Sequence, residues 1–94
     1  MINHKKVTLD NVTWTPITPG ADCYHCEINN ITGVVMKIRT DQADANTEVS
    51  IQSLQVYEIT PPDSGRNLTM HATQTLCYAQ LSSGSAVVTI KSTK

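Results

Sequence analysis

The chain has 94 residues, 7 of them basic and 8 acidic, with a formal net charge of −1, so it can form one domain with a small core. A nucleic-acid-binding module normally shows a basic patch with interleaved aromatic residues, and this signal is absent, which predicts no nucleic-acid partner. No apolar run approaches the roughly 20 residues of a membrane-spanning helix, so no membrane partner is expected. The first ten residues lack the apolar stretch of a signal peptide, which predicts a protein made in the cytoplasm and not exported by that route.

β-branched residues dominate the composition, because Val, Ile and Thr together supply 29 of the 94 residues. These side chains lose rotamer freedom in a helix and pack well on a pleated sheet. There is no Phe, one Trp and three Tyr, so the core must be built from aliphatic side chains. The composition therefore predicts an all-β protein whose thin core would gain from oligomerisation or from docking on a larger body.

In chain order, residues 1–6 are polar and are expected to form an N-terminal arm, with residues 7–94 forming a single domain. Residues 7–15 alternate with a slip near Asp10, which indicates a turn or bulge between two short stretches. Pro16 and then Pro19-Gly20 are expected to end this segment, because proline cannot donate to a sheet hydrogen bond.

The middle of the chain carries the clearest strand. Residues 22–31 form a second strand region, and residues 31–34 are expected to turn into a third. That third strand alternates cleanly over residues 34–39. Val34, Met36 and Ile38 are expected on one face, and Val35, Lys37 and Arg39 on the other. Residues 41–46 form a polar loop.

The second half repeats the pattern of short strands and turns. Strand segments are expected near residues 49–51 and 54–59, separated by a turn or bulge around Gln52, and again at residues 68–72, 77–81 and 86–91. Residues 61–65 give a strong loop signal, and the Ser/Gly turn at 82–85 is expected to close a hairpin. Seven or eight short strands at this spacing predict a single small antiparallel β-sandwich, possibly of the jelly-roll type.

Three cysteines invite a metal or redox hypothesis. Cys23 and Cys26 could supply half of a zinc site, completed by Cys77 with His25 or His71. In a strand, however, positions three apart lie on opposite faces and about 10 Å apart, so a strand rules out a disulfide between Cys23 and Cys26, and one ion can join them only if residues 23–26 form a turn. A disulfide of Cys77 with either cysteine stays geometrically possible. We therefore expect three reduced, buried thiols, no bound metal and no cofactor.

No catalytic constellation stands out, and we expect a protein that is not an enzyme. His25 and His71 are interpreted as half-exposed strand residues, and the acids of the 41–48 loop lack the dense spacing of a calcium loop. The Asn-x-Thr sequons are interpreted as strand-end Asn followed by strand Thr. An exposed aromatic platform would favour a small carbohydrate-binding module as an alternative. The histidines are His4, His25 and His71, and the loop acids are Asp41, Asp44 and Glu48. The aromatic residues are Trp14, Tyr24 and Tyr57, and the sequons begin at Asn11, Asn30 and Asn67.

The order of features from residue 28 to residue 91 resembles that of small β-sandwich virion proteins of tailed bacteriophages. The strand at residues 28–30 is followed by a glycine-containing turn, a short strand at 34–39 and a polar loop. A strand then ends in a Pro or Gly corner at residues 57–62, and two strands joined by a Ser/Gly turn close the domain. Capsid decoration (cement) proteins and some tail or neck adaptors have this order, although the corner here departs from the usual glycine form.

This resemblance implies a structural protein that binds the outer capsid surface, as a homotrimer between capsomers, and stabilises the shell. Its partner would be the major capsid protein or another virion protein, and its location the virion; a tail or neck component is the alternative. Many modest contacts repeated around a shell would give the attachment avidity. The residues expected to contact the partner are the polar arm and three basic side chains: Met1, Ile2, Asn3, His4, Lys5, Lys6, Lys37, Arg39 and Arg66.

Overall fold

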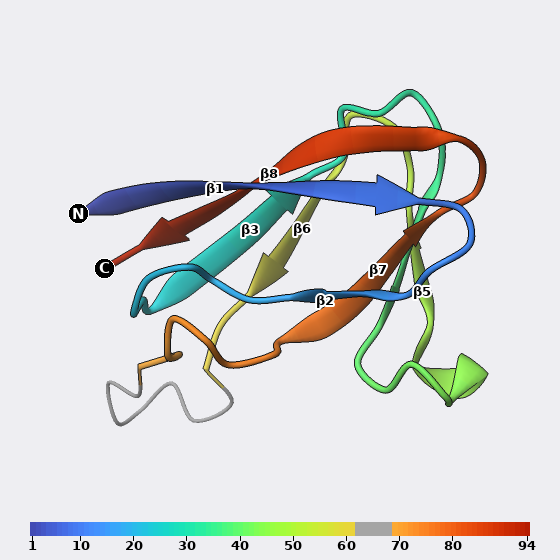
Figure 1. The fold of residues 1–94 in the computed structure, drawn as a ribbon. Helices are drawn as coiled ribbons and strands as arrows, with labels where there is room; N and C mark the ends of the chain where they lie inside the picture. Colours follow the sequence, from blue (N-terminus) through green and yellow to red (C-terminus); the bar gives the residue numbers. More distant parts are fainter. Residues whose placement is uncertain (62–68) are drawn as a thin grey trace.

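The computed structural model describes residues 1–61 and 69–94, which form two four-stranded antiparallel sheets packed face to face (Figure 1). The first sheet contains β1 (Ile2–Asp10), β8 (Ser85–Thr93), β3 (His25–Asn29) and β6 (Val56–Ile59), in this order. The second contains β2 (Thr15–Ile17), β7 (Cys77–Leu81), β4 (Met36–Arg39) and β5 (Val49–Ile51), also in this order. One short 3₁₀ helix, η1 (Ala45–Thr47), lies between β4 and β5. Within the described residues, no helix has the length and hydropathy that a membrane crossing requires.

The strand order is that of a jelly roll. Each strand of the first half pairs with its counterpart counted from the other end, so that β1 pairs with β8, β2 with β7, β3 with β6 and β4 with β5. The pairs β3–β8 and β4–β7 then complete the two sheets. Eight strands in two such sheets, connected as two Greek keys, define the jelly roll. The predicted small antiparallel sandwich of this type is confirmed.

Period-two alternation builds the core from the facing sides of the sheets. Met36 and Ile38 of β4 are fully buried while Lys37 and Arg39 face outward, as the sequence predicts. Strand β8 likewise buries Val88 and Ile90. The remaining large, fully buried apolar side chains come from both sheets, and they are Leu9, Ile17, Ile28 and Leu81.

The N-terminal residues do not form an arm. Residues 2–6 belong to β1 and pair in register with β8, from Ile2 opposite Thr93 to Lys6 opposite Thr89. β1 is an edge strand, and natural sheets protect such edges with charged side chains, Lys above all. The polar composition therefore marks an exposed sheet edge, and the ammonium of Lys5 donates to the Thr18 hydroxyl.

Two further local predictions need correction. Pro16 does not end a segment but lies inside β2, which tolerates it because β2 is the edge of its sheet. The Ser/Gly turn after β7 does not close a hairpin, because β7 and β8 belong to different sheets. Consecutive strands share a sheet only at β4 and β5, so nearly every connection crosses the sandwich.

The loop and strand predicted at residues 61–65 and 68–72 lie partly outside the described residues. Within the described part, Met70 forms an isolated antiparallel bridge with Cys23. The turn expected around Gln52 is confirmed, since the amide of Gln55 donates to the Gln52 carbonyl at 3.0 Å. The turn near Asp10 is also confirmed, because the Asp10 carboxylate accepts from the amides of Val12 and Thr13 at 2.9 and 2.7 Å.

Candidate functional site

The outer face of the β1-β8-β3-β6 sheet carries a row of charged and titratable side chains. The strand registers place His4 opposite Lys91, Lys91 opposite Glu27, and Glu27 opposite Glu58. One side chain from each of the four strands therefore forms a line straight across the sheet. This charged row runs over the outside of the sandwich, since the residues next to Glu27 and Lys91 in their strands are buried.

On this face, the side chains of His25, Glu27 and Glu58 lie close together where β3 pairs with β6. His25 Nε2 lies 3.7 Å from Glu58 Oε1, and Lys91 Nζ lies 3.5 Å from Glu27 Oε1. One ligand atom each of His25, Glu27 and Glu58 lies within 4.8 Å of the others. Among the described residues this is the one group of three potential metal ligands.

Exposed apolar side chains gather at one end of the same sheet. Val56 of β6 and Val87 of β8 point outward, and Ile31 and Leu54 lie just beyond the end of the β3–β6 pairing. The chain is held together there by two backbone hydrogen bonds, from Asn30 to the Gln55 carbonyl at 2.9 Å and from Leu54 to the Asn30 carbonyl at 2.6 Å. These hydrogen bonds hold the loops after β3 and before β6 side by side. We call Ile31, Leu54, Val56 and Val87 the apolar rim.

Leu54 is the most unusual member of the apolar rim. It has φ = 71°, in the left-handed region, and its side chain is 80% exposed. A non-glycine L-residue costs about 1–2 kcal/mol in this conformation, and an exposed leucine returns little burial energy. The folded chain alone does not explain a leucine at this position.

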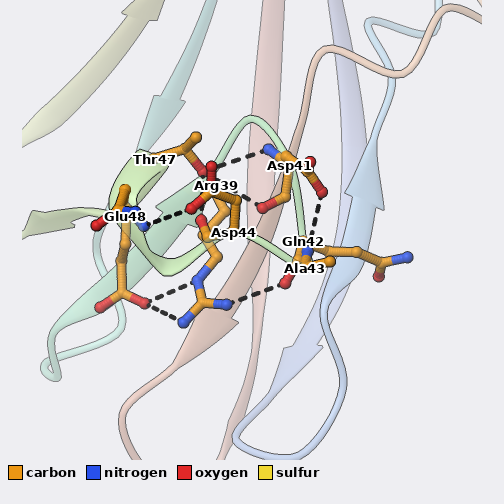
Figure 2. A network of polar contacts seen from close by, with 8 residues as sticks. Arg39, Asp41, Gln42, Ala43, Asp44, Thr47 and Glu48 are labelled. Atoms are coloured by element: carbon orange, nitrogen blue, oxygen red, sulfur yellow. Dashed lines mark hydrogen bonds and ion pairs between the residues drawn. The ribbon is translucent and has the colours of Figure 1, made fainter.

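The acids of the β4–β5 connection form a structural network with Arg39 (Figure 2). Arg39 binds Glu48 through Nε at 2.9 Å and Nη2 at 2.8 Å, and its Nη1 donates to the Gln42 carbonyl at 2.9 Å. Asp41 and Asp44 accept hydrogen bonds from nearby backbone amides of the same loop. These carboxylates are thus turned toward their own loop, in agreement with the interpretation that they are loop residues.

The predicted contact residues do not share one surface. Ile2, His4 and Lys6 lie exposed on the outer face of the first sheet, whereas Lys37 and Arg39 lie on the outer face of the second. Asn3 and Lys5 take the alternate phase of β1 and are half-buried beside Gly20. Met1 is exposed at the end of β1, and Arg66 lies outside the described residues. Whether these residues touch a partner stays a prediction.

The three cysteines are free and buried in the core. Burial raises the pKa of Cys26 to about 11 and that of Cys77 to about 12, and it also raises the pKa of Cys23. Since the thiolate is the nucleophile and metal ligand, these groups are poorly suited to either role near neutral pH. Within the described residues, the cysteines do not join a group of three potential metal ligands.

The aromatic residues considered for sugar stacking do not form a shared platform. Tyr57 packs against the core, and burial raises its pKa. Trp14 is covered by the Arg39 guanidinium at 4.4 Å and approached by the Lys37 ammonium at 5.8 Å. Tyr24 is half-exposed beside Lys94 at the other end of the sandwich, where its amide donates to the Thr93 carbonyl.

Comparison of the chain with protein-family models, with curated proteins and with solved structures gives no match. The function must therefore be argued from the surface itself. Sequence reasoning overlooked Glu27, Glu58 and the apolar rim. The alternation of His25 with Glu27 places both on one strand face, but Glu58 joins them only through the β3–β6 register, which the sequence does not show.

Proposed function

We propose that this protein is a non-enzymatic interaction protein that docks on a larger protein assembly with the outer face of its β1-β8-β3-β6 sheet. Its most concrete form is a capsid decoration protein that binds the outer surface of a virus shell and stabilises it, with a tail or neck component as the alternative. The observation that carries this proposal is the apolar rim, and above all the exposed, left-handed Leu54.

The apolar rim has the chemistry of an interface centre. Four large apolar side chains remain exposed at one end of a rigid sheet, and burying apolar surface contributes about 25 cal/mol per Å². The charged row of His4, Lys91, Glu27 and Glu58 continues across the same face. An apolar centre contributes affinity, while the polar groups around it select the partner and set its orientation.

The fold is compatible with this role but does not decide it. Jelly rolls form viral capsid proteins and also lectins, so the architecture serves both virion assembly and sugar binding. The covering of Trp14 by Arg39 and the inward position of Tyr57 leave the sugar-binding alternative with less support. A homotrimer at the junction of capsomers would repeat the apolar rim three times, and multivalency would convert modest contacts into stable attachment.

The test is an add-back experiment with virus particles assembled without this protein. The purified chain is added, and its binding is followed by co-sedimentation and located by cryo-electron microscopy. We expect saturable binding at fixed positions on the shell and a higher temperature of shell rupture. Density on the tail or neck would instead support the alternative role.

Matched variants connect the binding to the apolar rim. Leu54→Asn removes the apolar side chain and keeps a residue that tolerates the left-handed region, and Val87→Thr keeps the shape of the side chain. Each is expected to weaken binding at least tenfold. Val12→Thr is the control, because Val12 is 79% exposed in the β1–β2 turn and lies outside the apolar rim. Absence of binding by the unmodified chain, or equal binding by all three variants, would overturn the proposal.

A further inference from the structure

We propose that His25, Glu27 and Glu58 form a binding site for a zinc-like divalent cation on the outer face of the β3–β6 pair. The three side chains come from two adjacent strands, and one ligand atom from each lies within 4.8 Å of the other two. This inference does not depend on the apolar rim or on the docking role.

The sheet itself positions the ligands. Glu27 and Glu58 are directly opposite each other in the β3–β6 register, and His25 is the next residue of β3 on the same face. Zinc binds imidazole nitrogen and carboxylate oxygen at about 2.0–2.2 Å, so two ligand atoms of one ion lie no more than about 4.4 Å apart. The 3.7 Å between His25 Nε2 and Glu58 Oε1 already meets this limit. Small side-chain rotations bring the Glu27 carboxylate within the same range.

The charges on this face also favour a cation. Like charges directly opposite on neighbouring strands destabilise a sheet, and Glu27 and Glu58 are such a pair. Lys91 partly offsets this repulsion through its contact with Glu27 at 3.5 Å. A divalent ion between the carboxylates would offset it more fully, and the half-exposed Lys91 side chain would turn away toward solvent. Lys91 is therefore a competitor for the site.

The ligand set indicates the class of metal. Calcium and magnesium prefer sites made only of oxygen ligands, whereas imidazole suits zinc and the neighbouring transition metals. Zinc usually has four ligands, so one imidazole and two carboxylates leave at least one coordination position free. Water can occupy that position, because Glu58 is exposed. The site is thus expected to bind zinc with modest affinity and to prefer it clearly over calcium.

The test is a titration of the full chain with zinc chloride, followed by the amide resonances in ¹⁵N NMR spectra, with calcium chloride as the comparison. We expect saturable shifts centred on β3 and β6 around His25, Glu27 and Glu58. His25→Gln and Glu58→Gln should each weaken zinc binding at least tenfold. His4→Gln is the control, since His4 lies on the same outer face but two strands away from Glu27.

A fourth variant tests the competition with Lys91. Lys91→Met removes the cation next to Glu27 and should tighten zinc binding several-fold, a change that a purely structural role of these residues does not predict. The spectrum of each variant without metal verifies its fold. The proposal is overturned if millimolar zinc causes no saturable shift, if the shifts centre on Cys23, Cys26 and Cys77, or if His25→Gln and Glu58→Gln bind as tightly as the unmodified chain.

Discussion

Arg39 lies over the ring of Trp14, with 4.4 Å between the guanidinium carbon and the ring centroid. The same guanidinium binds Glu48 and the Gln42 carbonyl (Figure 2). One side chain therefore joins β4, the loop that follows it and, through Trp14, the connection between β1 and β2. Planar, multivalent recognition of this kind suits arginine and not lysine. We therefore assign Arg39 to the stability of this corner and not to a free docking surface.

Arg39→Lys is expected to lower the free energy of unfolding by about 1–2 kcal/mol, because it keeps the charge and loses the planar fork and much of the stacking. Thermal unfolding measures this loss as a shift of about 4–8 °C per kcal/mol for a domain of this size. Lys37→Met is the control, since Lys37 lies 5.8 Å from the same ring and should change stability by less than about 0.5 kcal/mol. Equal effects of the two variants would contradict this assignment.

Asn30 is expected to be the most sensitive polar position. It is fully buried, and its amide donates to the carbonyls of Val34 and Ile51 at 2.8 Å each, while its oxygen accepts from the amide and hydroxyl of Thr32. Asn30→Leu removes all of these hydrogen bonds, and each half-buried group left without a partner, such as the Ile51 carbonyl, costs about 1–3 kcal/mol. We expect urea unfolding to show that the free energy of unfolding falls by about 2–4 kcal/mol.

Asn29→Ala is the neighbouring control for Asn30, because Asn29 is exposed and should change stability by no more than about 0.5 kcal/mol. A small effect of Asn30→Leu would show that the network around Asn30 does not hold the loops together. The burial of Asn30 also supports the interpretation of its sequon as a structural Asn, since a glycan cannot be attached to a side chain inside the folded domain.

The sequence predicts the strands of this fold better than their pairing. Alternation identifies the buried phase of residues 36–39 and 86–90, because a strand with one face in the core must follow a period of two. It does not show that β7 and β8 lie in different sheets, since a Ser/Gly turn serves a hairpin and a crossing between sheets equally well. The site depends on pairing even more: Glu27 and Glu58 meet only because β3 and β6 are neighbours.

Leu54→Gly is expected to stabilise the protein slightly. Glycine removes the cost of about 1–2 kcal/mol of a left-handed leucine, and its greater freedom in the unfolded chain offsets about 0.5–1 kcal/mol of that gain. The 80% exposed side chain contributes little packing. Urea unfolding should therefore show a net gain of roughly 0.5 kcal/mol, while binding to the partner assembly falls. Leu54→Ile should lower stability, and a Gly variant less stable than the Ile variant would refute the strain argument.

The buried thiols predict a loss of stability at alkaline pH. Burial raises the pKa of Cys77 from 9.0 to about 12 and that of Cys26 from 9.0 to about 11. Between pH 9 and 11 the unfolded chain therefore releases thiol protons that the folded chain retains. The contribution of the thiols to stability is complete below pH 9 and decreases as the pH rises. Half-buried Tyr57, whose pKa burial raises from 10.0, acts in the same direction.

Urea unfolding at intervals between about pH 8 and 10 tests this dependence before most other groups titrate. Stability is expected to fall with pH, and Cys77→Ala should be less stable at pH 7 but should show a flatter dependence, because one of the shifted groups is gone. Iodoacetamide should label the native thiols slowly at pH 8 and all three rapidly in urea. A stability that stays constant up to pH 10, or rapid labelling of the folded chain, would show that the thiols are accessible and ionise as freely as in the unfolded chain.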